Sequence, residues 1–226
     1  MIDCAVIVEP RLHLFLKPVI DNILRNINIE IPIIIFHSIN NKDFIIENYR
    51  EYIESTKIRL ILLKEINLTI SQYNNLLTSL NFWDKIIGEN ILIFQTDSCL
   101  CRHMNTFDFT KYKDYGFVGA PSFNNNTWRN GGLSLRKKSH MILAIKDHMK
   151  KTNTPITIAE DKFFTVLKKD IVKPCSYILG TEFSVEKYYN NNPLGLHKTW
   201  KYITKEQWNE LKNKFNEINL TFGSYY

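Results

Sequence analysis

The first half of the chain alternates short, continuous apolar runs with longer segments whose apolar residues recur every three to four positions. Short apolar runs indicate buried strands, and the longer period indicates amphipathic helices. The pattern predicts strands at 4–9, 31–38, 59–63 and 90–95, and helices at 18–26, 43–54 and 71–87. Alternation of this kind favours βαβ units and a mostly parallel sheet that helices cover on both faces.

The second half of the chain keeps apolar runs but loses the regular alternation. It predicts extended segments at 115–123, 129–136 and 192–200, a helix from 136 to about 150, a short helix through 159–169 and an amphipathic helix over 205–216. No internal repeat and no low-complexity linker divides it. We therefore expect one α/β domain over 1–226, with a nucleotide-binding half at 1–100, an acceptor or catalytic half at 101–203 and a C-terminal helix and tail at 204–226.

Composition narrows the class of partner. The 226 residues are 44% hydrophobic, which is enough for one substantial core, and the formal net charge is +6. This charge favours an anionic ligand, but the lysines are interleaved with acids, so we expect no nucleic-acid partner. No stretch is apolar enough to predict a transmembrane segment, and the N-terminus resembles a first strand rather than a signal peptide.

Cysteine usage and missing motifs exclude several classes. The four cysteines, Cys4, Cys99, Cys101 and Cys175, show no zinc spacing, which suggests reduced thiols in a cytoplasmic setting. Residues 8–13 read VEPRLH, so the first strand has no glycine-rich turn after it, and no Walker loop, serine elbow or two-histidine zinc motif occurs. Dinucleotide-dependent hydride transfer, P-loop hydrolysis and zinc proteolysis are therefore disfavoured.

Polar residues follow the predicted strands at their carboxyl ends, where open α/β sheets bind ligands. Glu9 and Arg11 follow the first strand, and Gln95 and Asp97 follow the strand at 90–95. We expect Glu9 and Arg11 to contact the substrate, with Arg11 on a phosphate or the base and an exposed surface arginine as the simpler alternative. A lone carboxylate such as Asp97 often only caps a turn.

Further along, two segments add chemistry that Asp97 could share. NGGLSLR supplies Gly131 and Gly132, where a ligand or another chain segment can approach the backbone closely, and PLGLHKTW supplies His197 and Lys198. A divalent cation that bridges a diphosphate needs few protein ligands, because phosphate oxygens and water complete its shell. Asp97 and His197 are the candidate pair.

The segments ILIFQTDS, GFVGAP, NGGLSLR, EDKFF and PLGLHKTW, in this order, resemble glycosyltransferase-like proteins of bacteria and large DNA viruses that are similar to the GT-A class. The resemblance implies a GT-A-like mixed, mostly parallel sheet flanked by helices, a nucleotide-sugar donor, and Mn²⁺ or Mg²⁺. The GT-A Asp-x-Asp motif contacts the donor ribose and the metal. Gln95 takes its first acidic position, as an expected substrate contact, and Asp97 takes the last, metal-binding one. Because Gln95 replaces an acid, the alternative that metal binding is weak or dispensable stays open.

The resemblance also implies roles for the remaining residues. EDKFF is similar to the Glu-Asp signature of inverting enzymes, which makes Asp161 the general base and lets Glu160 position the acceptor or anchor its loop. Acids that merely start a helix are the alternative. His197 would complete the metal site and Lys198 would contact the diphosphate. Other expected substrate contacts, each with a purely structural alternative, are Asn130, Gly131, Gly132 and Trp200.

Three functions follow from these residues. The first is an inverting hexosyl- or deoxyhexosyl-transferase that moves a sugar from a UDP or other nucleoside-diphosphate donor to a hydroxyl of a glycan or other acceptor. The second is a nucleotide-sugar or carbohydrate-binding module that has lost turnover. The third is a glycosidase with two carboxylates about 5 to 10 Å apart. The expected location is the cytoplasm, or a host cytoplasm for a viral protein, and the oligomeric state stays open.

Overall fold

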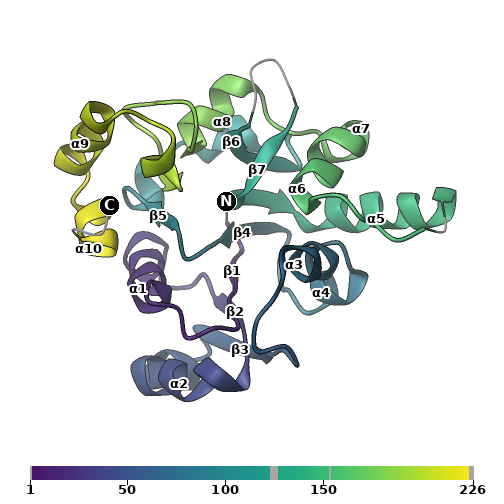
Figure 1. The fold of residues 1–226 in the computed structure, drawn as a ribbon, viewed down its shortest axis with the longest axis horizontal. Helices are drawn as coiled ribbons and strands as arrows, with labels where there is room; N and C mark the ends of the chain where they lie inside the picture. The colour runs from purple at the N-terminus through teal and green to yellow at the C-terminus, as the bar shows by residue number, and fades with distance from the viewer. Residues whose placement is uncertain (1, 123–126, 153, 224–226) are drawn as a thin grey trace.

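The computed structural model describes residues 2–122, 127–152 and 154–223, and a six-stranded mixed sheet forms the centre of this part of the chain (Figure 1). Its strand order is β3-β2-β1-β4-β7-β6. The strands are β1 (Cys4–Val8), β2 (Ile33–His37), β3 (Ile58–Leu62), β4 (Asn90–Phe94), β6 (Phe117–Pro121) and β7 (Arg129–Lys137). Strands β1 to β4 pair in parallel, whereas β7 runs antiparallel to both β4 and β6. The expected mixed, mostly parallel sheet is confirmed.

Helices cover both faces of this sheet because its inner strands are apolar on both sides. One face packs against α1 (Leu16–Asn26) and α2 (Ile39–Glu54), and α10 (Asn216–Phe222) and α9 (Lys205–Lys214) extend the same core beyond α1. The other face packs against α3 (Ile70–Leu77), α4 (Leu80–Asp84), α5 (Lys138–Thr152) and α7 (Lys169–Val172). Successive strand residues alternate between the two cores: Ile7 and Leu92 lie in the first, and Val6 and Ile93 in the second.

Side-chain caps explain where helix boundaries differ from those expected. The helix expected at 71–87 is two helices, because Thr78 Oγ1 bonds back to the Asn74 carbonyl and Ser79 Oγ accepts from the Phe82 amide to start α4. Helix α2 begins at Ile39 rather than 43, since Ser38 and Asn41 form a capping box.

The second half holds elements that the local pattern did not indicate. The expected segment 115–123 contains β6, and residue 123 lies outside the described residues. Arg136 lies inside strand β7 rather than at the start of a helix. The segment 159–169 splits into α6 (Glu160–Lys162) and a short π-helix (Phe163–Leu167). Helices α8 (Tyr177–Phe183) and α10 were not expected, and short 3₁₀ turns lie at Met104–Thr106, Phe109–Tyr112 and Thr199–Lys201.

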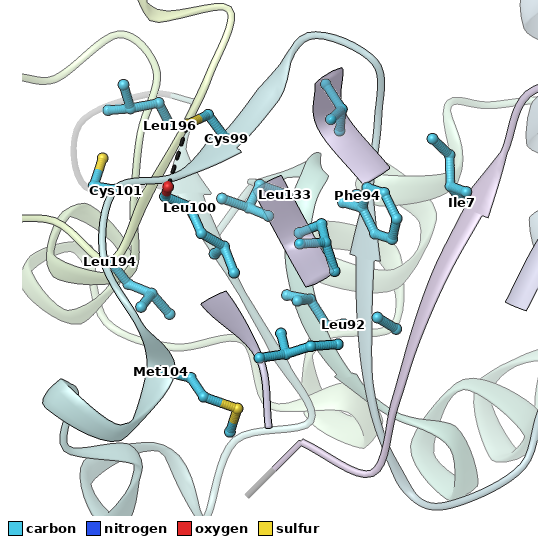
Figure 2. Packing of buried hydrophobic residues seen from close by; sticks show 14 of the residues in the cluster. Ile7, Leu92, Phe94, Cys99, Leu100, Cys101, Met104, Leu133, Leu194 and Leu196 are labelled. Atoms are coloured by element: carbon cyan, nitrogen blue, oxygen red, sulfur yellow. Dashed lines mark hydrogen bonds between the residues drawn. The ribbon is translucent and has the colours of Figure 1, made fainter. Parts of the chain in front are cut away.

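A second, three-stranded sheet of β5 (Ser98–Leu100), β9 (Gly195–His197) and β8 (Ser184–Val185) lies beside the large one. Figure 2 shows how its side chains pack into the core of the large sheet: Leu100 and Leu196 lie in the same cluster as Phe94 of β4 and Leu133 of β7. Strand β5 follows β4 after three residues, and β9 pairs with β5 antiparallel. This packing fixes the polar residues at the ends of β4 and β9 against each other.

All four cysteines lie in the described part of the chain, where each is buried and outside any disulfide, in line with reduced thiols. Burial raises the pKa of the Cys99 thiol to about 12. Within residues 2–122, 127–152 and 154–223, no helix combines the length and apolarity needed to cross a bilayer.

Candidate functional site

A cavity of about 440 Å³ opens at the carboxyl ends of β1 and β4, beside the first residues of β7. Because β7 is antiparallel to β4, its N-terminal end meets the carboxyl ends of its neighbours there. The cavity brings together nearly all of the expected site residues: Glu9, Arg11, Gln95, Asp97, Asn130, Gly131, Gly132, Glu160, Asp161, His197 and Lys198. Residues that are more than 100 positions apart in the sequence, such as Glu9 and His197, thus line one space.

Strand pairing places Asp97 against His197. Ser98 of β5 lies opposite His197 of β9, so the preceding residue, Asp97, reaches the imidazole. The Asp97 Oδ1 and His197 Nε2 atoms are 3.2 Å apart, and both are buried without a well-formed hydrogen bond to any described residue. Lys198 Nζ lies 3.2 Å from the other carboxylate oxygen, Oδ2. Burial alone would raise the pKa of Asp97, but His197 and Lys198 outweigh it and hold that pKa well below its usual range.

This pair fits two ligands of a divalent cation. Two ligand atoms each about 2.1 Å from one ion, at neighbouring positions of its shell, lie about 3 Å apart, close to the observed Asp97–His197 spacing. Buried polar atoms that lack a partner are costly unless something else contacts them. Among the described residues no third histidine, cysteine or acid joins the pair, so an ion would also need oxygen ligands from a substrate or water.

Gln95, in the position of the missing acid, has a partner of its own. Its Nε2 donates to the Tyr73 hydroxyl of α3 at 3.0 Å, and its backbone amide donates to Ser98 Oγ at 3.1 Å. Gln95 therefore joins α3 to the end of β4 and lines the cavity.

The two glycines of β7 leave room for neighbouring side chains. A Cβ added at Gly132 would lie 2.1 Å from His197 Nε2, and one at Gly131 would lie 2.4 Å from Glu160 Oε1. Neither glycine is at a hairpin turn, since both lie inside strand β7. Larger residues at these two positions would displace the imidazole or the carboxylate from the cavity wall.

Glu160 is held by a buried arginine that the sequence did not indicate as a site residue. Arg136 Nη1 and Nη2 donate to Glu160 Oε2 and Oε1 at 2.6 and 3.0 Å, and the two side chains are 0% and 6% exposed. Arg136 also donates to Ser134 Oγ and the Gly131 carbonyl and lies over the Phe117 ring. The position of Arg136 two residues after Ser134, on the same face of β7, is the pattern that could have identified it.

Asp161 differs from Glu160 in having no arginine partner of this kind. Burial, reinforced by the neighbouring charge of Glu160, raises the pKa of Asp161 to about 6, although Trp128, the Lys162 amide and Arg136 lower it in part. The Lys162 amide donates to Asp161 Oδ1 at 2.6 Å. A carboxylate in a cavity with a pKa near neutrality is suited to accept a proton from a substrate.

Glu9 and Arg11 form an ion pair just after the end of β1. Arg11 Nε and Nη2 donate to Glu9 Oε1 and Oε2 at 2.8 and 2.7 Å, so two of the three guanidinium nitrogens already contact an acid. Asn41 Nδ2 donates to the backbone carbonyls of both residues. The buried Glu9 thus anchors the loop, and the half-exposed Arg11 lies at the rim of the cavity.

Other residues at the site were not anticipated, and one expected residue lies elsewhere. Tyr73 and Asn74 of α3 line the cavity, and Asn74 Oδ1 accepts from the Glu160 amide at 3.1 Å. Glu186, just after the unexpected strand β8, lies behind His197. Trp200 is not among the described residues that line the cavity; its ring packs 5.1 Å from Phe222 and 6.0 Å from Trp208, which indicates a core role.

Comparison with known structures supports the fold. The apo-form glycosyltransferase GlyE of Streptococcus pneumoniae TIGR4 superposes with a TM-score of 0.56 at 14% identity, over 96% of this chain and 63% of that chain. A second GlyE structure from the same organism gives 0.53 at 15% identity, with the same coverage. The chain thus spans just under two thirds of the length of these neighbours. At this identity the likeness is evidence for a shared fold, and it confirms the expected GT-A-like class.

Sequence comparison places the chain in a family. No curated protein matches it significantly. A family model described as "Protein of unknown function (DUF5672)" matches residues 57–197, which include Gln95, Asp97, Asp161 and His197. The matched segment covers more than half of the 226 residues. The chain therefore belongs to the DUF5672 family, and it has the fold of a glycosyltransferase.

Proposed function

We propose that the protein is a glycosyltransferase that moves a sugar from a nucleoside-diphosphate donor, with UDP the expected nucleotide, to a hydroxyl of a glycan or other acceptor. One observation carries the proposal. The cavity holds both the Asp97–His197 pair, with buried atoms that lack partners, and Asp161, a carboxylate whose pKa is raised to about 6. These are the two kinds of group that transfer requires, one for the leaving diphosphate and one for the attacking hydroxyl.

On the donor side, Asp97 and His197 would hold Mn²⁺ or Mg²⁺. When bound, such an ion supplies positive charge to a leaving diphosphate. Lys198, whose Nζ is 3.2 Å from Asp97 Oδ2, would add a second cationic group that a diphosphate oxygen can contact. Since Lys198 and His197 already flank Asp97, a donor site that works without metal is the alternative.

On the acceptor side, Asp161 would accept the proton of the acceptor hydroxyl while that oxygen attacks the anomeric carbon. The bond from this carbon to the diphosphate breaks as the new glycosidic bond forms, and the nucleoside diphosphate leaves. A single displacement of this kind inverts the anomeric centre. Glu160 is less suited to be the base because both of its oxygens accept hydrogen bonds from Arg136. The same ion pair removes Glu160 as the second carboxyl group that a glycosidase needs beside Asp161, and Asp97 is already paired with His197 and Lys198, so a glycosidase is disfavoured.

The metal role is tested by calorimetric titration of UDP in the presence of Mn(II) and in the presence of a chelator. We expect tighter binding with Mn(II), and we expect Asp97→Ala and His197→Ala to remove this difference. Equal UDP affinity in both conditions would exclude the proposed metal role and favour the site in which Lys198 replaces it.

Turnover is tested by a screen of UDP-sugars and other nucleotide sugars for release of the nucleoside diphosphate. Water serves as the acceptor because the natural acceptor is not identified. We expect slow hydrolysis of at least one donor by the wild-type protein and none by Asp161→Asn. A protein that binds a nucleotide sugar with measurable affinity but never cleaves it would instead be a binding module.

A further inference from the structure

Glu186 is a buried carboxylate next to His197 that takes no part in the proposed chemistry. Strand β8 pairs with β9 in parallel, with Val185 opposite Leu196. This register places the residues that come next in the sequence, Glu186 just after β8 and His197 at the end of β9, side by side. The Glu186 Oε1 and His197 Nδ1 atoms are 3.7 Å apart, and the two side chains are 4% and 3% exposed. Glu186 is not among the described residues that line the cavity, so any effect on a ligand must pass through a neighbour that does, such as His197 or Asn130.

Both sides of this contact have unused hydrogen-bonding capacity. Glu186 Oε2 and His197 Nδ1 are buried, and neither has a hydrogen-bond partner among the described residues. Asn130 Nδ2 donates to Glu186 Oε1 at 3.3 Å, while Asn130 Oδ1 accepts from the Gly132 amide at 2.7 Å. Asn130 therefore ties the carboxylate to strand β7, which indicates that Glu186 is held in place rather than free to turn away.

The chemistry of a histidine ligand explains what this carboxylate can do. An imidazole binds a metal through a nitrogen that carries no proton, so a ring that uses Nε2, the atom facing Asp97, must carry its proton on Nδ1. A buried N–H group needs an acceptor. The Oε1 atom of Glu186 lies 3.7 Å from this nitrogen, and carboxylates in that position commonly fix the tautomer and orientation of a histidine ligand.

We propose that Glu186 is a positioning residue that holds the proton of His197 on Nδ1 and thereby keeps Nε2 available for a divalent cation shared with Asp97. This inference rests on the proposed function, because it concerns the metal side of the same site. It assigns Asn130 a role as well: Asn130 supports the Glu186 carboxylate instead of contacting only the sugar.

The test compares the wild-type protein with Glu186→Gln, which keeps the shape of the side chain and lacks its charge. Mn(II) binding is measured by the loss of the free-ion electron paramagnetic resonance signal, with UDP present at saturation. We expect Glu186→Gln to weaken Mn(II) binding ~10- to 100-fold, the usual effect of removing such a partner. In chelator, its UDP affinity and thermal midpoint should match those of the wild type. The matched control is Glu182→Gln, a partly exposed glutamate of α8 that pairs with Lys111.

A second measurement reports the tautomer directly. ¹⁵N chemical shifts of His197 with UDP and diamagnetic Mg²⁺ present should show the proton on Nδ1 in the wild type. At the same Mg²⁺ concentration Glu186→Gln should show a mixture of tautomers, because Asp97 attracts the proton to an Nε2 that binds no metal. Unchanged Mn(II) affinity together with an unchanged tautomer would overturn the inference and leave the proposed function intact. A wild-type protein that binds no Mn(II) with UDP would overturn the metal site itself, and the inference with it, so the two failures are distinct.

Discussion

Arg136 and Glu160 form a doubly hydrogen-bonded ion pair inside the protein, and Glu160 directly precedes Asp161 in the sequence. The pair joins β7, the strand next to the edge strand β6, to the start of α6 beside the cavity. It occupies Glu160 with a structural task and leaves Asp161 as the carboxylate of this segment whose pKa lies near neutrality. Two neighbouring acids therefore have different environments, one paired with an arginine and one with a raised pKa.

The first prediction concerns this pair. Arg136→Met should destabilise the protein by about 3–5 kcal/mol, because it leaves the Glu160 carboxylate buried without a partner. The double variant Arg136→Met with Glu160→Met should recover much of this loss, since it removes both charges. The free energy of unfolding in urea measures both effects. A single variant as stable as the wild type would show that Glu160 finds another partner or reaches solvent.

The second prediction concerns Gly132. Gly132→Ala should weaken binding of UDP with Mn(II) by about tenfold or more, because the new Cβ would overlap the His197 ring and push it from its place beside Asp97. Gly132→Ala should also lower the thermal midpoint of the protein. Combining it with His197→Ala removes the overlap, so the thermal midpoint of the double variant should be higher than that of Gly132→Ala alone. Independent, additive losses in this double-mutant cycle would contradict the close approach.

The third prediction is the pH dependence of activity. A base must be unprotonated to accept a proton, and the pKa of Asp161 is raised to about 6, so kcat/KM should fall as pH drops below about 6. The profile is measured with a donor found in the hydrolysis screen, between pH 4.5 and 8. A rate that stays level down to pH about 4.5, well below the raised value, would exclude Asp161 as the titrating base.

The fourth prediction links the same group to stability. The pKa of Asp161 rises from an ordinary 3.8 to about 6 on folding, so the native state favours the protonated form and loses stability as pH rises through this window. Asp161→Asn should therefore be more stable than the wild type by about 1–3 kcal/mol at pH 7.5. The difference should vanish near pH 4, where the wild-type carboxyl is also neutral. Thermal midpoints at both pH values give the comparison, and an equal difference at the two would argue against a buried, raised carboxyl.

The local sequence pattern predicted the sheet and much of its cavity because parallel strands place the residues after their carboxyl ends at one edge. Glu9, Gln95 and Asp97 were found in this way. Pairings between distant segments have no local signature, so the β5–β9 ladder that unites Asp97 with His197 could be expected only through resemblance. The pattern predicts Arg136 at the start of a helix, because a charged residue is rarely buried on the inward face of a strand, where it lies in β7.

Two further residues show that the local pattern does not predict long-range neighbours: it missed Glu186 and it placed Trp200 at the site. Glu186 follows a strand of only two residues, too short to appear as a pattern, and its importance depends on the register of that strand with β9. Trp200 was expected at the site because it follows the sequence PLGLHK, yet a 3₁₀ turn at Thr199–Lys201 carries its ring toward α9 and α10. Nearness in sequence did not translate into nearness in space.

The most direct test of the whole account measures donor affinity and turnover in one preparation of Asp161→Asn, with Glu160→Gln as the neighbouring control. Asparagine keeps the size of the side chain and can still accept the Lys162 amide hydrogen bond, but it cannot take up a proton. The account predicts a donor affinity close to that of the wild type and a turnover that falls by roughly 100-fold or more. Normal turnover by Asp161→Asn, with or without a loss in Glu160→Gln, would contradict it.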